Sequence, residues 1–308
     1  MKKIIAAMLS LVLLAVLLAG CGSTTNSTSS TDTSNTGTST SNSTAPASIA
    51  MDGSSALLPL AQQAATDYMA KNGNVTITAS GGGSGTGLND VLAGTVDIGN
   101  SDVYAEEKLT SDQAGQLVDH KVALIGVALI VNSDVGATVK NLTSDQILGI
   151  FTGTITNWKD VGGPDEAITI VNRPSSSGTR SLFTKWALNG TASVDGVSDA
   201  LTTDDSNALM TMVGQTQGAI GYLALSYLVN SDPSISKVQI NGVDATYDNI
   251  YNNTYQVWGY EHMYTNGTPS AAVQDFLDYM VSDDMATVAD SMGYGTIASL
   301  SSAAAASR

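Results

Sequence analysis

The sequence is poor in cysteine, histidine and basic residues. Its 308 residues include one Cys, two His and 12 Lys or Arg, against 28 Asp or Glu, so the formal net charge is −16. A single Cys excludes intramolecular disulfides and cysteine-based zinc clusters. The acidic balance makes nucleic acid a poor partner. No His, Asp and Glu cluster has metal-ligand spacing, so we predict neither a metal nor a cofactor.

The one cysteine, Cys21, ends a segment that is typical of a secretory signal. Two lysines at the start are followed by an apolar run over residues 4–18, shorter than the roughly 20 residues that span a membrane. The residues Leu18-Ala19-Gly20-Cys21 resemble a bacterial lipobox. We therefore expect residues 1–20 to be a lipoprotein signal peptide and Cys21 to be lipidated. The alternative is an ordinary signal peptide with an incidental Cys.

Large apolar residues are also missing from residues 22–48, which are almost all Ser, Thr, Asn and Gly. Such a composition cannot bury enough apolar surface to offset the entropy of ordering. We interpret residues 21–48 as the lipidated Cys and a flexible tether. The remaining chain of about 260 residues can form one large or two medium domains.

In this remaining chain, a strand, a Gly/Ser-rich turn and a helix follow one another three times. The predicted units are strand 49–51, turn 52–55 and helix 57–71; strand 75–79, turn 81–87 and a helix with Leu88 and Val91; and strand 168–171, turn 173–179 and a helix with Leu182 and Phe183. Further predicted elements are strand 122–131, a helix from the capping box at 143–146, helix 206–213, strand 219–225 and helix 269–281. Alternating strands and helices predict an α/β fold with a mostly parallel sheet covered on both faces.

Each of the three turns places Gly, Ser or Thr at a helix start. Helix N-termini bind anions because they expose unpaired N–H groups and a partial positive charge. Any one turn is typical of an ordinary helix cap, but three in one chain favour an anion site. Gly82 and Gly87 have the spacing of a Walker loop, but Leu88 stands where the Lys belongs, which argues against a nucleotide.

Two charged residues complete this predicted site. Arg173 ends a strand directly before the third turn, and a guanidinium makes bidentate, charge-assisted bonds to an oxyanion. Asp102 follows the apolar strand Ile98–Ser101. An ionised carboxylate only accepts hydrogen bonds, so it suits an anion that carries a proton. Phosphate has a P–OH group near neutral pH and sulfate has none, so Asp102 can discriminate between them. The alternatives are a cap for Asp102 and a surface ion pair for Arg173.

At these residues the chain resembles the phosphate-binding subunit of the bacterial high-affinity phosphate ABC importer. The resemblance covers residues 49–298 and rests on several stretches together. They are Gly53–Pro59, Gly83–Gly87, Val96–Asp102, Arg173–Thr179, Leu142–Gly163 and Gly218–Tyr222. The resemblance implies a two-lobed periplasmic-binding-protein fold of type II, in which each lobe is a mostly parallel sheet flanked by helices and the ligand lies in the interlobe cleft.

The resemblance also implies the ligand contacts. It assigns them to Ser84, Asp102, Arg173, Ser177, Gly178 and Thr179, and to backbone N–H groups that we place at Leu57 and Leu58; Ser55 is added on its chemistry. Some relatives have an acidic residue where Ser175 stands, so we expect Arg173 to lack that fixing partner. The segment Tyr255–Tyr260 also departs from the family pattern, and we expect it to affect the hinge.

The expected function is capture of inorganic phosphate and its delivery to the transmembrane subunits of an ABC permease. We expect lobe 1 over 49–127 and 258–300, lobe 2 over 128–257 and a flexible C-terminus over 301–308. The protein would be a monomer, held by its lipid on the outer face of the cell membrane. The long tether suggests a Gram-positive cell.

Two other functions compete with this one. One is binding of another tetrahedral oxyanion, namely sulfate, molybdate or tungstate, and Asp102 argues against it. The other is catalysis, as a secreted phosphatase or serine hydrolase. His120 and His262 do not adjoin a Gly-x-Ser-x-Gly elbow, so we predict that the protein is not an enzyme.

Overall fold

The computed structural model describes residues 46–190, 201–230 and 232–308. The predicted signal peptide, Cys21 and most of the predicted tether therefore lie outside the described residues. The first strand, β1, begins at Ala47, so the last two residues of the predicted tether belong to the fold. Over the described ranges, no helix combines the length and apolar character needed to cross a membrane.

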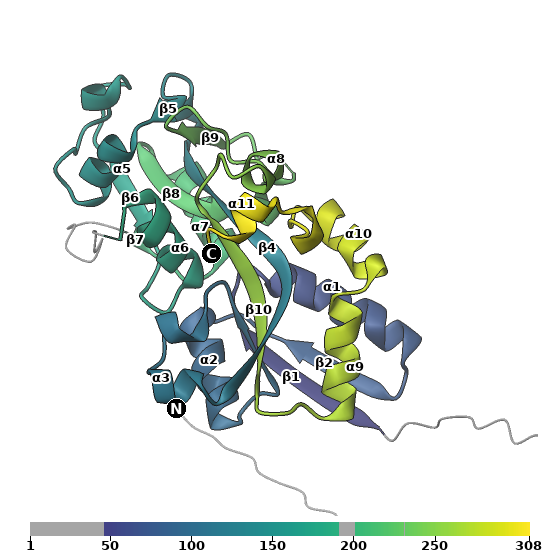
Figure 1. Ribbon diagram of the computed structural model, residues 1–308. Coiled ribbons are helices and arrows are strands. Elements are labelled where there is room, and N and C mark those ends of the chain that lie inside the picture. The colour runs from purple at the N-terminus through teal and green to yellow at the C-terminus, as the bar shows by residue number, and fades with distance from the viewer. Residues whose placement is uncertain (1–45, 191–200, 231) are drawn as a thin grey trace, which may run out of the picture. The chain divides into compact units, whose positions relative to one another are not determined.

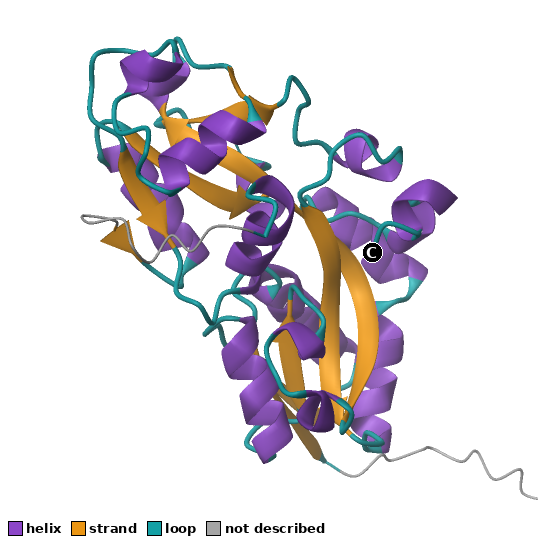
Figure 2. Cartoon of the chain, turned by 60° about the vertical axis from the view of Figure 1, so that its left-hand side comes forward, coloured by secondary structure: helices purple, strands orange, loops and turns teal. Residues whose placement is uncertain are grey.

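A mixed sheet forms the centre of the fold, with helices on its faces (Figures 1 and 2). Its strands are β1 (Ala47–Gly53), β2 (Val75–Ala79), β3 (Ile98–Ser101), β4 (Leu117–Asn132), β5 (Asn141–Leu142), β6 (Thr169–Asn172), β7 (Leu201–Thr202), β8 (Ala219–Ala224), β9 (Ile235–Ile240) and β10 (Trp258–Asn266). The main path through the sheet is β2-β1-β3-β10-β4-β8-β6-β7, and β9 pairs with β4 and β5.

Strand β4 connects the two ends of this sheet. Its residues Leu117–Gly126 pair with β10, and Val127–Asn132 pair with β8 and β9. All of these pairings are antiparallel, as is β10 with β3, whereas β1 with β2 and β3, and β6 with β7 and β8, are parallel. The α/β class is confirmed, but the sheet is less parallel than predicted. The lobe boundaries stay a prediction, although β4 changes partner beside the expected boundary.

The helices follow the strands as the sequence predicts. The α-helices are α1 (Leu58–Lys71), α2 (Ser84–Ala93), α3 (Ser111–Ala114), α4 (Ser133–Gly136), α5 (Ser144–Phe151), α6 (Gly178–Ala187), α7 (Ser206–Gln215), α8 (Tyr247–Tyr251), α9 (Ala271–Met280), α10 (Asp283–Ser291) and α11 (Ser302–Ala305). Short 3₁₀-helices are η1 (Ala105–Glu107), η2 (Trp158–Val161), η4 (Leu225–Leu228) and η5 (Ile297–Ser299). The predicted capping box is confirmed, because Thr143 and Gln146 bond reciprocally.

Two large apolar clusters hold the helices on the sheet. One joins β1 to α1 and α9 through Ile49, Leu60 and Phe276. The other packs α5 and α6 on β8, where the rings of Phe183 and Tyr222 stack with centroids 4.2 Å apart. Because these clusters fix α1 and α6 on the sheet, they also fix the two loops that precede these helices.

The C-terminal segment 301–308, which the sequence predicts to be flexible, includes the short helix α11. Ser301 caps α11, and Ala304 within it is fully buried. The Arg308 guanidinium lies 3.7 Å and 4.2 Å from the ring centroids of Trp186 and Trp258. Such cation–π contacts are not visible in the periodicity of the sequence.

Candidate anion-binding site

The starts of helices α1, α2 and α6 meet at one place in the fold. The Gly83 N–H donates to the Gly53 carbonyl at 2.8 Å, which joins the turns before α1 and α2. The Gly85 N–H donates to the Ser176 carbonyl, also at 2.8 Å, which joins α2 to the turn before α6. Three helix N-termini, each with partial positive charge, therefore converge as the sequence predicts.

Asp102 lies between these helix starts and is only 2% exposed. Its Oδ2 accepts from the Thr179 hydroxyl at 2.7 Å, and its Oδ1 accepts from the Ser54 hydroxyl. Its backbone N–H donates to Ser84 Oγ at 2.9 Å. Both carboxylate oxygens of Asp102 therefore act as hydrogen-bond acceptors in this arrangement.

Ser54 is a site residue that sequence reasoning missed. Besides donating to Asp102, its Oγ accepts from the N–H groups of Ala56 and Leu57 at 3.0 Å each. The Leu57 amide, a predicted ligand donor, is thus already paired, while Leu58 is the first residue of α1. Ser54 and Ser55 are adjacent in the same turn, and no sequence pattern shows which of them faces Asp102.

Arg173 is 1% exposed and is held by groups from two other loops. Its guanidinium donates to Ser55 Oγ at 2.6 Å, to Ser206 Oγ at 3.0 Å and to the Asp204 carbonyl at 2.7 Å. An Asp204 carboxylate oxygen lies 3.9 Å away. The expectation that Arg173 lacks a fixing partner is therefore wrong. Ser175 is not acidic, but Asp204, in the segment before α7, provides the acidic partner. The Nε of Arg173 has no hydrogen-bond partner among the described residues.

Asp204 and Lys108 are further charged residues that contact this site. Burial raises the pKa of Asp204, against the opposing effect of Arg173. Lys108 Nζ donates to the carbonyls of Ser175 at 2.6 Å and Ser177 at 3.1 Å, and burial lowers its pKa. Neither residue stood out in the sequence, because an isolated Lys and an Asp before a helix usually serve as a solvated charge and a cap.

The start of α6 is packed closely against Asp102. Ser177 caps α6 by accepting from the Arg180 N–H at 3.2 Å. A Cβ atom added at Gly178 would overlap Ser84 Oγ and lie 2.8 Å from Asp102 Cβ. A side chain at this position would therefore push α6 away from the other two helix starts.

We expect Gly178→Ala to impair anion binding and to destabilise the fold by about 1–3 kcal/mol, the usual cost of overpacking. Denaturant unfolding and anion titration of the same sample would measure both effects. Gly73→Ala is the matched control, because a Cβ at Gly73 meets nothing within 4 Å. Equal behaviour of the two variants would contradict the close packing at Gly178.

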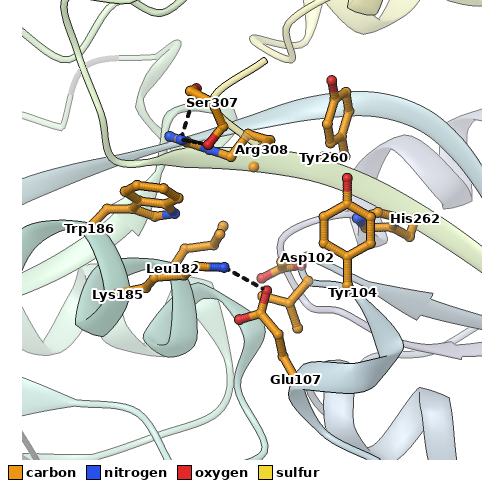
Figure 3. Close-up of a pocket in the computed structure, with 12 residues that line it drawn as sticks. Asp102, Tyr104, Glu107, Leu182, Lys185, Trp186, Tyr260, His262, Ser307 and Arg308 are labelled. Carbon is orange, nitrogen blue, oxygen red and sulfur yellow. Dashed lines mark hydrogen bonds and ion pairs between the residues drawn. The ribbon is translucent and has the colours of Figure 1, made fainter. Parts of the chain in front are cut away.

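A cavity of about 190 Å³ lies beside Asp102, between η1, α6, β10 and the C-terminal residues. Figure 3 shows Lys185 and Glu107 paired at one side of this cavity, with Nζ and Oε1 3.2 Å apart. His262 lines the cavity, but its Nδ1 is 2.7 Å from Asp119 Oδ1. This pairing is structural and joins no hydroxyl nucleophile. No cluster of metal-ligating side chains occurs within the part of the chain that the structure describes.

Comparison with known proteins agrees with this geometry. Residues 31–284 match the PBP superfamily domain. The phosphate-binding protein PstS of Bacillus subtilis is 46% identical over 238 residues, which are 77% of this chain and 76% of that protein. The chain belongs to the PBP superfamily, in the family of bacterial phosphate-binding proteins.

Solved structures of this family share the fold. A substrate-binding protein from Clostridium perfringens, assigned to a phosphate ABC transporter and solved with bound phosphate, has a TM-score of 0.72 and 29% identity, covering 81% of this chain and 99% of that one. An ABC-type phosphate transport receptor from Vibrio cholerae has a TM-score of 0.66 and 28% identity, covering 80% and 99%. The periplasmic-binding-protein fold predicted from the sequence is thereby confirmed.

Proposed function

We propose that this protein binds inorganic phosphate outside the cytoplasm and delivers it to the transmembrane subunits of an ABC permease. The observation that carries the proposal is the buried Asp102 carboxylate at the meeting point of three helix starts, with the buried Arg173 held close by. Adjacent residues of one turn contact the two groups, because Ser54 donates to Asp102 and Ser55 accepts from Arg173. Phosphate is also what the names of the PstS relatives state for those proteins.

The arrangement suits a protonated oxyanion. Ionised Asp102 would accept from the P–OH group, and sulfate would meet the same carboxylate without a proton to offer. Arg173 would bind a phosphate oxygen, with help from the helix starts. The proposed ligand residues are those predicted, together with Ser54. The predicted residues are Ser55, Leu57, Leu58, Ser84, Asp102, Arg173, Ser177, Gly178 and Thr179.

Closure of two lobes would bring these groups around the ligand. Ser55 and Ser54 come from the half of the sheet that contains β1, whereas Arg173 and Thr179 come from the half that contains β6. The hydrogen bonds between Ser55 and Arg173 and between Thr179 and Asp102 cross from one half to the other. We propose that phosphate replaces some of these contacts when the protein binds it.

Binding without catalysis is the test that separates this function from the competing phosphatase. The purified protein should retain radiolabelled phosphate in equilibrium dialysis and should release no phenol from an aryl phosphate. Excess unlabelled phosphate should displace the label, whereas excess sulfate should not. Steady release of the phenol at a rate that follows protein concentration would favour the phosphatase.

The proposal includes a lipid anchor at Cys21, on the sequence evidence of the lipobox. Cys21→Ala should abolish incorporation of labelled palmitate and move the protein from the membrane fraction to the medium, because the Cys thiol is the attachment point. Gel fluorography and cell fractionation would measure the two effects. Ser23→Ala, two residues further on, is the matched control. Membrane retention of Cys21→Ala would contradict the anchor.

A further inference from the structure

A second carboxyl group lies behind Asp102 and has no part in the site described so far. Glu261, in β10, is fully buried, and neither of its carboxyl oxygens has a hydrogen-bond partner among the described residues. It also forms none of the ion pairs found there. A buried carboxylate without a partner is strongly disfavoured, so this residue needs a physical explanation.

Glu261 lies beside Asp102 where the pairing of β10 with β3 ends. Strand β10 pairs antiparallel with β3, with His262 opposite Ser101 and Met263 opposite Asn100. Asp102 directly follows β3 and Glu261 directly precedes His262, so both residues adjoin the last pair of this register. The Asp102 carboxyl group is close enough to act on that of Glu261, and two like charges at such a place are unfavourable.

The groups around Glu261 offer no cation to balance a second charge. On its other side it pairs with Ala123 of β4. Tyr294 and Tyr247 approach it from the segment after α10 and from α8. Burial raises the pKa of both phenols, so both stay neutral and neither is a cation. Lys121 lies on the opposite face of the sheet, 4.1 Å from the ring centroid of Tyr260.

His262 lies on the face that carries Lys121 and Tyr260, not on the face of Glu261, since alternate residues of a strand point to opposite sides. Figure 3 shows Tyr260 and His262 at the cavity, and the residue between them in the sequence is Glu261. His262 is bonded to Asp119 there. Asp102 is therefore the charged group that Glu261 faces within the part of the chain that the structure describes.

The two carboxyl groups differ in what surrounds them. Asp102 accepts two hydroxyl hydrogen bonds, from Ser54 and Thr179. Glu261 accepts none. Burial, and then the neighbouring charge of Asp102, raise the pKa of Glu261 well above its usual range. Paired acids in unequal environments divide in this way into one charged and one neutral group.

We propose that Glu261 is a neutral, proton-bearing positioning residue that supports Asp102 from behind and keeps the single negative charge of the pair on Asp102. This role rests on the proposed phosphate function, because it explains how Asp102 stays an acceptor for the P–OH group. If Glu261 lost its proton, a second buried negative charge would oppose the bound phosphate. Phosphate affinity and protonation of Glu261 are therefore linked.

Infrared spectroscopy of the full wild-type chain tests the protonation directly. The chain has four glutamates, of which Glu106 and Glu107 are exposed and Glu166 is half-buried. With a heavy carbon isotope in the glutamate side-chain carboxyl, a shifted band of a protonated acid should be present at pH 8, and E261Q should lack it. Absence of this band in the wild type would overturn the proposal whether or not the protein binds phosphate.

Phosphate titrations of the same full chain test the positioning role. At pH 7, E261A should bind about tenfold more weakly than the wild type, because loss of the side chain leaves a cavity behind Asp102, and E261Q, which fills that space, should bind more tightly than E261A. Above the pH at which the glutamate band disappears, wild-type affinity should fall by up to tenfold per pH unit. E261Q should show no such fall.

The outcomes separate the two proposals. If the wild type and E261Q weaken in parallel above that pH, or if E261Q binds no better than E261A, the positioning role is wrong. If the band persists at every pH at which the protein stays folded, Glu261 never loses its proton. Phosphate affinity should then depend on pH in the same way for the wild type and E261Q, and any difference overturns the role. A wild type that shows the band but binds no phosphate at pH 7 contradicts the proposed function instead.

Discussion

Replacing Asp102 by Asn is expected to weaken phosphate binding by about 1.5–3 kcal/mol, or roughly 10- to 150-fold, and to give measurable sulfate binding. The Asn side chain presents an N–H donor where the carboxylate presented only acceptors. It would no longer repel an oxyanion that has no proton. Calorimetric titration of the variant with phosphate and with sulfate would measure the change in selectivity.

The control for this prediction is Asp145→Asn. Asp145 is exposed in the first turn of α5, so its replacement changes the net charge by the same amount away from the site. It should leave both affinities close to those of the wild type. An Asp102→Asn protein that still excludes sulfate would show that this carboxylate does not set the selectivity.

The second large effect is expected for Arg173→Ala, which should weaken phosphate binding by about 2–5 kcal/mol. The loss removes the buried cation of the site and leaves Asp204, whose carboxylate oxygen lies 3.9 Å from the guanidinium, without its partner. Equilibrium titration with phosphate measures the affinity, and denaturant unfolding measures any accompanying loss of stability.

Arg173→Lys is the informative comparison. It keeps the charge but lacks the planar guanidinium, which here donates to Ser55, Ser206 and the Asp204 carbonyl at once. We expect an affinity between those of the wild type and Arg173→Ala. A Lys variant that matches the wild type would mean that Arg173 contributes only charge, and an Ala variant that matches it would remove Arg173 from the site.

Much of this fold could be predicted because its signals are local. The turns before α1, α2 and α6 are marked by Gly with Ser or Thr, and the apolar faces of these helices repeat with helical spacing. The mixed character of the sheet could not be predicted from such signals, because the antiparallel pairing of β4 with β10 joins segments far apart in the sequence. Periodicity identifies a strand but does not identify its neighbour.

The site likewise contains residues that local sequence signals predict and residues that they do not. Asp102, Ser84, Gly178 and Thr179 stand in motifs that could be recognised, and the structure brings them together. Asp204 and Ser206 acquire their role only when the start of α7 packs beside Arg173, and Glu261 only through the register of β10 with β3. The net charge of −16 taken alone argues against an anionic ligand, but salt screens distant charges beyond about 10 Å, so local groups govern a buried site.

The most direct test of the central claim is calorimetric titration of the phosphate-stripped protein, lacking residues 1–21, with phosphate and separately with sulfate. The account predicts one-to-one phosphate binding and no heat from sulfate at the same concentrations. Sulfate binding as tight as phosphate binding would contradict the role of Asp102. No response to any oxyanion would mean that the three helix starts are only capped and that the proposed function is wrong.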